Sequence, residues 1–127
     1  MVGHSIGPAF LLKVIERLNF QIKAAFFVSG FVSDLGNPDF DEINRTFYGR
    51  LEWDKIRRNC NKFEVFHSDN DPYVPFGKAE ELAENLCTEV IMVKEAGHFN
   101  ADSGYTTFDF LLGRINAELN SAHEKKE

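Results

Sequence analysis

Apolar residues recur at helical spacing in three stretches of the chain. The first runs from residue 5 to residue 18, and Pro8 is tolerated there because it falls in the first turn. The stretches are marked by Ile6, Phe10, Leu11, Val14, Ile15 and Leu18, then by Ala79, Leu82, Ala83 and Leu86, and last by Phe108, Leu111, Leu112, Ile115 and Leu119. Each spacing predicts an amphipathic helix with one face against a core.

Short apolar runs of the length of a strand lie between these helices. Residues 22–30 are apolar almost throughout, as is the centre of residues 89–97, which is typical of strands buried on both faces of a parallel sheet. Residues 62–67, KFEVFH, predict a third strand, and the turn-rich residues 68–72 its exit. Alternating strands and helices indicate parallel βαβ units. We therefore predict an α/β fold, a three-layer α/β/α domain around a mostly parallel sheet.

Two parts of the chain follow neither pattern. Residues 31–60 sustain no core period, and Asp, Asn, Gly and Pro punctuate their first half, so we expect a lid-like insertion with one short helix at 51–59. Residues 121–127 are expected to form a polar tail. Because no internal repeat is present, residues 1–127 are assigned to a single domain.

Composition and charge narrow the classes of partner. The chain has 127 residues, 43% of them hydrophobic and 27% charged, as in ordinary globular proteins. Its net charge of −6 argues against nucleic acid and membrane surfaces as partners, because both require a basic face. Cys60 and Cys87 have no spacing typical of a disulfide framework or a zinc site. We expect a cytoplasmic protein, since no apolar stretch reaches about 18 residues and no basic signal-peptide start is present.

Residues 3–7 are GHSIG, a match to the G-x-S-x-G nucleophile elbow. In this motif the serine sits on a sharp turn between a buried strand and a helix, and both glycines are expected to leave room where the two nearly touch. Ser5 is therefore a candidate nucleophile, although a serine that opens a helix is also a common N-cap. Only Met1 and Val2 precede the motif, too few for the strand that we expect in front of it.

Asp71 and His98 complete a set of hydrolytic type. Each follows a predicted strand, as Ser5 follows Val2, and functional groups gather at the carboxyl ends of parallel strands. The chain order serine, aspartate, histidine is the one found with a nucleophile elbow. Asp69 is a rival acid, but Asp71 leads directly into the next helix. The other histidines are placed less well, in the elbow, at a strand end and in the charged tail: His4, His67 and His123.

The three residue types fit nucleophilic catalysis. His98 would accept the hydroxyl proton of Ser5 as the oxygen attacks a carbonyl carbon, and Asp71 would stabilise the imidazolium that forms. The backbone N–H of Ile6 would donate to the oxyanion. This chemistry requires no metal and no cofactor.

Other interpretations of single residues stay open. His67, Asp69 and Asp71 are metal-ligand types, but no second cluster completes them, and Val74 stands where an EF-hand needs glycine. Aromatic side chains of residues 31–60 are candidates for the wall of a substrate pocket, although most of the 13 Phe are expected in the core. These candidates are Phe31, Phe40, Phe47, Tyr48 and Trp53, and we select Phe31 and Trp53.

With these residues in place, the chain resembles a small serine-hydrolase family of the α/β-hydrolase fold, which contains retinoblastoma-binding protein 9 and many bacterial proteins. The resemblance runs from Gly3 to about Ile115 and rests on GHSIGPAFLLKVIERL, FFVSGF, WDKIRRNC, SDNDPYVPFGKAEELAENL and EAGHFNADSGYTTF. It implies Ser5 as nucleophile, Asp71 as triad acid and His98 as base. It also implies hydrolysis of small carboxylic esters or amides without metal or cofactor.

The resemblance also leads to an expectation about the start of the chain. Members of the family begin with further strands and helices, so we expect an N-terminal truncation on the order of 60 residues. Three strands would then remain, the residues before the elbow could not pair, and residues 22–30 would form an exposed apolar edge. That edge would be a site for homodimer formation.

Two functions therefore remain as alternatives. The first is a serine hydrolase acting on a small-molecule ester or amide, with a rate lowered by truncation. The second is a non-catalytic protein-interaction module that derives from this family and keeps the triad residues without using them. A fluorophosphonate probe distinguishes the two, because only a working nucleophile reacts with it.

Overall fold

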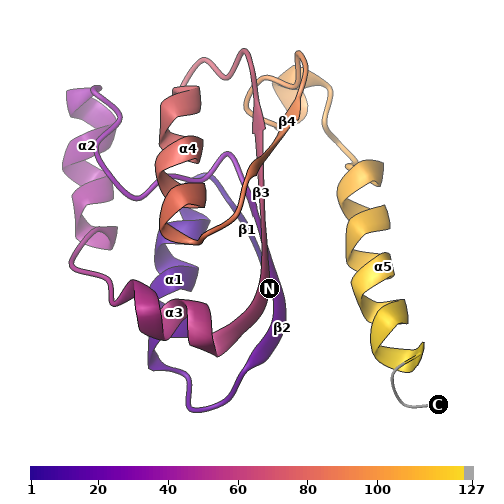
Figure 1. The fold of residues 1–127 in the computed structure, drawn as a ribbon. Coiled ribbons are helices and arrows are strands. Elements are labelled where there is room, and N and C mark those ends of the chain that lie inside the picture. The colour runs from indigo at the N-terminus through magenta and orange to yellow at the C-terminus, as the bar shows by residue number, and fades with distance from the viewer. Residues whose placement is uncertain (125–127) are drawn as a thin grey trace.

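The computed structural model describes residues 1–124. Four parallel strands form one sheet in the order β1-β2-β3-β4, with bounds Val2–His4, Ile22–Val28, Cys60–Ser68 and Val90–Val93. The helices are α1 (Gly7–Arg17), α2 (Pro38–Asn44), α3 (Trp53–Asn59), α4 (Phe76–Asn85) and α5 (Asp109–Glu124), with short 3₁₀ turns at Arg45–Phe47 and Ala101–Ser103. Helices α1, α3 and α4 cover one face of the sheet and α5 covers the other (Figure 1). The predicted three-layer α/β fold is confirmed.

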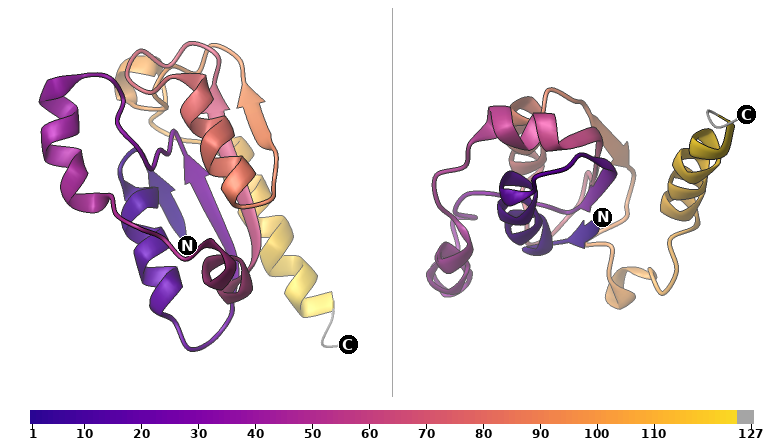
Figure 2. Two further views of the ribbon diagram at one scale, coloured as in Figure 1. Left: turned by 60° about the vertical axis from the view of Figure 1, so that its left-hand side comes forward. Right: turned by 90° about the horizontal axis from the view of Figure 1, so that it is seen from below.

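The strand in front of the elbow forms despite its length, so our expectation about it was wrong. Residues 2–4 pair in parallel with residues 26–28 of β2. Three residues suffice because β2 already presents its backbone N–H and C=O groups in register. The sheet thus has four strands, and its edge strands in the described part of the chain are β1 and β4. Strand β2, which we expected to be an exposed apolar edge, is paired on both sides (Figure 2).

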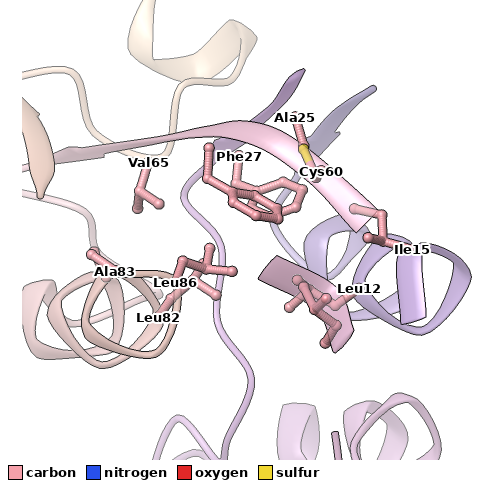
Figure 3. Packing of buried hydrophobic residues seen from close by; sticks show 12 residues of the cluster. Leu12, Ile15, Ala25, Phe27, Cys60, Val65, Leu82, Ala83 and Leu86 are labelled. Atoms are coloured by element: carbon pink, nitrogen blue, oxygen red, sulfur yellow. The ribbon is translucent and has the colours of Figure 1, made fainter. Parts of the chain in front are cut away.

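Alternation along β2 divides its side chains between two cores. Ala25 and Phe27 face the layer of α1, α3 and α4, where Leu12 and Ile15 of α1 meet Leu82 of α4 (Figure 3). Phe27 is completely buried, and full burial of such a side chain contributes about 1.5–3 kcal/mol. This double burial explains why residues 22–28 are apolar without alternation in their sequence.

The other core lies between the sheet and α5. Ala24, Phe26 and Val28 of β2 face it, and Phe66 of β3 joins them. Phe108, Leu111 and Ile115 pack against this cluster from the start of α5 and the residue before it. Buried Glu64 also faces α5 and pairs with the guanidinium of Arg114. An ion pair therefore holds α5 to the sheet beside the apolar contacts.

The predicted lid-like insertion, residues 31–60, divides into two parts. Helix α2 in the first part stands away from the sheet, outside the layer of α1 and α4 (Figure 1). Helix α3 in the second part packs on α1, and its Ile56 is fully buried in the core. A lid-like role for the first part stays a prediction.

The remaining differences concern the ends of elements. Strand β4 ends at Val93 instead of residue 97, because the chain turns through positive φ angles of 54° at Glu95 and 57° at Gly97. Residues 121–124 of the predicted polar tail belong to α5, and residues 125–127 lie outside the described residues. None of the helices in the described part of the chain is both long and apolar enough to cross a membrane.

Candidate active site

Ser5 occupies the turn between β1 and α1. Its φ of 61° is a left-handed conformation that non-glycine residues rarely adopt, and its N–H donates to the carbonyl of Val28 at 2.9 Å. The helix begins at Gly7 with Ile6 as its N-cap residue, and no side chain caps it. The alternative that Ser5 is an N-cap is therefore wrong, because its hydroxyl points to another partner.

The two glycines of the elbow differ in what they allow. A Cβ on Gly3 would lie 2.9 Å from Cδ1 of Leu11 and 3.0 Å from the nitrogen of Pro8. Gly3 thus permits the close approach of strand and helix. A Cβ on Gly7 would meet no atom within 4 Å, so the steric reason that we gave for Gly7 was wrong.

The structure brings Ser5, His98 and Asp71 into one hydrogen-bond chain. The Nε2 atom of His98 lies 3.1 Å from Oγ of Ser5, and its Nδ1 atom lies 2.9 Å from Oδ2 of Asp71. A neutral imidazole satisfies both contacts if Nδ1–H donates to the carboxylate and Nε2 accepts the Ser5 hydroxyl proton. That tautomer is the one a general base requires.

Asp71 is held as a carboxylate. Its side chain is fully buried, which opposes ionisation, but His98 donates to Oδ2 and the N–H groups of Tyr73 and Val74 donate to Oδ1 at 2.8 and 2.9 Å. Against the cost of burial, these hydrogen bonds lower the pKa of Asp71 below its ordinary value of 3.8. The acid is therefore charged at neutral pH.

Three side chains just before Asp71 hold the loop that carries His98. Ser68 donates to the carbonyl of Gly97 at 2.5 Å, Asp69 accepts from the N–H of Glu95 at 2.7 Å, and Asn70 accepts from the N–H of Gly97 at 2.8 Å. We call residues 68–71 together with residues 95–98 the acid–histidine corner. Asp69 does not contact His98 in this arrangement, so it is a positioning residue and not the acid.

The alternative of a metal site is not supported by this geometry. His67 is completely buried in β3, and its Nε2 lies 2.9 Å from the carbonyl of Val74. Oδ2 of Asp71 lies 3.8 Å from that Nε2 but is hydrogen-bonded to His98, and Asp69 accepts from Glu95. In residues 1–124 no three His, Cys, Asp or Glu side chains are grouped so that they could hold a metal ion.

Ile6 follows Ser5 at the N-terminal end of α1, an 11-residue helix. Backbone N–H groups at such an end lack intrahelical acceptors, and the helix dipole favours negative charge there. Ile6 also lines the cavity beside Ser5. The position suits a donor to an oxyanion, which is the role that we predict for its N–H.

A cavity of about 320 Å³ adjoins Ser5, Ile6 and His98. We call it the acyl-side cavity. Its remaining walls come from two segments, residues 31–44 and residues 73–74: Phe31, Leu35, Phe40, Asn44, Tyr73 and Val74. Phe31 therefore lies where we predicted a pocket residue, on the wall of the cavity nearest to the triad.

Trp53 does not line this cavity, so its selection was a mistake. It lies on α3, packs against the core cluster below the sheet and borders a separate depression with Arg50 and Arg58. Tyr48 stands behind the wall, edge-to-face with Phe31 at a ring distance of 6.3 Å, and burial raises its pKa to about 12. The aromatic residues of the irregular segment 31–60 therefore lie partly at the cavity and partly at the core. Tertiary packing decides which, and their spacing in the sequence does not show it.

Some residues of the site were missed. His4 is exposed, and its Nε2 donates to the carbonyl of His98 at 2.7 Å while the two rings lie 4.8 Å apart. Tyr73 meets the ring of His98 edge-to-face at 5.2 Å. The sequence offered one signal for His4 and for Asn70, since each is the immediate neighbour of a candidate catalytic residue. Asn44 had no such signal.

Known proteins resemble the chain in sequence. The family described as serine hydrolase matches residues 1–116. Serine hydrolase RBBP9 of Rattus norvegicus is 32% identical over 99 residues, which cover 78% of this chain and 52% of that protein. The YdeN protein of Bacillus subtilis is 29% identical over 109 residues, which cover 84% of this chain and 56% of that protein. The chain therefore spans about half the length of these curated relatives.

Solved structures resemble it as well. The ydeN gene product of B. subtilis superposes with a TM-score of 0.85 at 26% identity, over 94% of this chain and 64% of that one. The esterase domain of a Rhodothermus marinus protein superposes with a TM-score of 0.56 at 20% identity, over 82% of this chain and 55% of that one, which shows a common fold only.

Proposed function

Because the chain belongs to the serine hydrolase family, we propose that Ser5, His98 and Asp71 hydrolyse small carboxylic esters or amides through an acyl-enzyme. One observation carries this proposal. The strained turn at Ser5 removes its hydroxyl from the helix and directs it to Nε2 of His98, whose other nitrogen binds a buried carboxylate. The buried Ser29 has a similar φ of 51°, so it is the hydrogen bond to His98, and not the left-handed conformation alone, that distinguishes Ser5.

The acylation half begins at the serine hydroxyl. Oγ of Ser5 attacks the carbonyl carbon, and its proton passes to Nε2 of His98. The carbonyl oxygen becomes an oxyanion near the N–H of Ile6, and the carboxylate of Asp71 stabilises the imidazolium. Nε2–H then protonates the leaving alcohol or amine as its bond to the carbonyl carbon breaks.

The second half releases the acid. Water takes the place of the leaving group, and His98 accepts one of its protons while the water oxygen attacks the acyl carbon. The proton then returns to Oγ of Ser5 as the ester bond to the enzyme breaks. The products are a carboxylic acid and the enzyme with its hydroxyl restored.

Labelling with a fluorophosphonate tests this proposal. The wild-type chain should gain one phosphonyl group, seen by intact mass, and should hydrolyse short nitrophenyl esters. Ser5→Ala should lose both. Ser121→Ala is the matched control, because its hydroxyl only contacts the carbonyl of Glu118 on α5 and the change is chemically the same.

The outcome also decides against the alternative function. If folded wild-type protein, checked by circular dichroism, takes up no phosphonyl group, Ser5 is not an activated nucleophile, and the protein-interaction module is the better description. Labelling that survives in Ser5→Ala would place the reactive group elsewhere.

A further inference from the structure

Two cavities share His98 in their walls. The acyl-side cavity contains Ser5 and Ile6. A second cavity of about 290 Å³ does not, and its lining includes Asn70, Glu95, Asn100 and Asp102. We call it the polar cavity. His98 and Tyr73 belong to the walls of both, so a substrate bound at Ser5 can reach into each of them.

The acyl-side cavity is apolar where it is deepest. Phe31 and Val74 are 2% and 1% exposed and form its inner end, while Phe40 and Tyr73 are 41% and 46% exposed and form its mouth. No Asp, Glu, Lys or Arg of the described residues lines it. A charged group placed there would lose its hydration and gain no ionic partner.

The polar cavity has the opposite character. The carboxylates of Glu95 and Asp102 lie in its wall with the amides of Asn70 and Asn100. A cation placed there keeps contact with water and is attracted by the two carboxylates. Both residues are exposed, so this attraction is weakened by salt.

The order of the reaction indicates which part of the substrate belongs in each cavity. The acyl group stays bonded to Oγ of Ser5 after the leaving group has departed, so it must fit the cavity that Ser5 and Ile6 line. The leaving group takes its proton from Nε2 of His98 and then diffuses away, so it must lie beside that residue and outside the space that the acyl group fills, and the polar cavity is the other cavity that His98 lines.

We infer that the substrates of this site join an uncharged, apolar acyl group to a polar or cationic alcohol or amine. The acyl chain occupies the acyl-side cavity, whose volume lies at the small end of the range of about 300–1,000 Å³ for ligand sites. The leaving group lies over the polar cavity. This inference rests on the proposed function and adds the polarity of each half of the substrate.

Moving one charge across the ester bond tests it directly. Choline butanoate carries a trimethylammonium group in the alcohol, and the ethyl ester of trimethylammonio-butanoate carries the same group in the acyl chain. For each, the reference is the neutral isostere in which tert-butyl replaces trimethylammonium. Hydrolysis is followed by proton release at constant pH, and kcat/KM is compared.

The charge should be rejected on one side only. On the acyl side it should lower kcat/KM by about 100-fold or more, because it is buried without a partner. On the alcohol side it should not lower kcat/KM, and any increase, of up to about threefold, should disappear in the double variant Glu95→Gln with Asp102→Asn. Equal effects on both sides, or the reverse preference, would overturn the inference.

Chain length gives a second measurement that does not depend on charge. From acetyl to hexanoyl, kcat/KM should rise about threefold per methylene in wild type, whereas lengthening the alcohol should change little. Phe40→Ala should flatten the acyl series by opening the mouth of the cavity. Phe20→Ala, an exposed residue outside both cavities, is the control and should keep the wild-type slope.

Failure of this inference and failure of the proposed function look different. If the enzyme is labelled at Ser5 and hydrolyses all the esters without regard to the position of the charge, only the inference is wrong. If neither labelling nor hydrolysis occurs, the proposed function is wrong and the inference falls with it.

Discussion

The acid–histidine corner and the wall of the acyl-side cavity are neighbours that are held in different ways. In the corner, four consecutive side chains, from Ser68 to Asp71, each bind residues 95–98 through a hydrogen bond. The segment that supplies most of the wall, residues 31–47, exposes large apolar side chains: Phe40, Ile43 and Phe47. A side chain of this segment that hydrogen-bonds to the rest of the domain is Ser33, which donates to Glu81 and accepts from Lys78, both on α4.

The two regions therefore control different properties: the corner controls the geometry of the catalytic groups, and the wall controls how the substrate fits. Hydrogen bonds are directional and short, so the corner fixes Nε2 of His98 relative to Ser5 within a narrow range. The wall has directional hydrogen bonds too, from the N–H groups of Leu35 and Gly36 to Asp41, but these lie within it, so it can adjust as a unit to different acyl groups. We therefore expect substitutions in the corner to act on kcat, and substitutions in the wall to act on KM and on the choice of substrate.

The largest effect should come from Asp71→Asn in the corner. The amide cannot stabilise the imidazolium and favours the wrong tautomer of His98, so kcat should fall by about 10⁴-fold with little change in KM. Asp34→Asn is the matched change in the wall, where Asp34 pairs with Arg45 at the surface. It should leave kcat within about twofold of wild type.

Steady-state kinetics on folded variants measures this contrast. A fall of less than about tenfold in kcat for Asp71→Asn would show that the corner does not control His98. A comparable fall for Asp34→Asn would remove the distinction between the two regions.

The Gly3→Ala variant tests whether the nucleophile elbow is as rigid as the acid–histidine corner. The new Cβ would press on Leu11 and on the nitrogen of Pro8, and the second contact is with backbone that cannot yield without moving α1. We expect a loss of about 1–3 kcal/mol in the free energy of unfolding and a lower kcat, because Ser5 moves with the helix. Gly7→Ala has open space and should not destabilise.

Urea unfolding of both variants measures the difference. Equal stability of Gly3→Ala and wild type would mean that strand and helix can separate at the elbow without cost, and the close approach would then not be what selects glycine.

The same substitution can be made at an asparagine in the corner, Asn70, and at one in the wall, Asn44, and the two effects on kcat and KM compared. Asn70→Ala removes the acceptor for the N–H of Gly97, so His98 loses one of its supports and kcat should fall about tenfold at unchanged KM. Asn44→Ala changes the lining of the cavity and leaves the corner intact, so KM and the preference among acyl groups should change while kcat holds. Parallel effects of the two variants on kcat and KM would contradict the comparison.

The sequence predicted the layers and the three residues of the hydrogen-bond chain because both depend on local signals. Apolar periods gave α1, α4 and α5, and each candidate followed a strand or a stub of one. Parallel strands bring such residues to one edge of the sheet, which is why Ser5, Asp71 and His98 meet across 93 positions of sequence.

What the sequence did not predict depends on contacts between distant segments. Asp69 looked like a second acid because nothing local shows that Glu95 will present its N–H to it. Strand β1 looked too short because a length rule ignores the partner strand. Trp53 looked like a pocket residue because residues 31–60 have no period, yet Ile56 draws α3 into the core. Cross-loop pairing has no sequence period to detect.

The smallest expected effect is on the free energy of unfolding. The carboxyl groups of Asp71 in the corner and Asp34 in the wall should differ in how their contributions to it depend on pH and salt. Burial opposes ionisation of Asp71, but its hydrogen bonds from His98, Val74 and Tyr73 lower its pKa in the folded state. A hydrogen bond from Arg45 lowers the pKa of Asp34. For both, the stabilising contribution is fully present above the unfolded pKa near 3.8 and is lost as the pH falls through the lower folded pKa.

The free energy of unfolding of wild type, Asp71→Asn and Asp34→Asn should therefore be measured from about pH 6 to about pH 2. Each variant should approach wild type as the pH falls below about 4, because the wild-type carboxylate then takes up its proton. In about 0.5 M salt the Asp34 contribution should vanish, since its ion pair is open to solvent, whereas the Asp71 contribution should persist because its side chain is fully buried. If salt reduced the Asp71 and Asp34 contributions equally, the carboxylate of Asp71 would be as open to solvent as that of Asp34. That result would contradict the comparison between corner and wall.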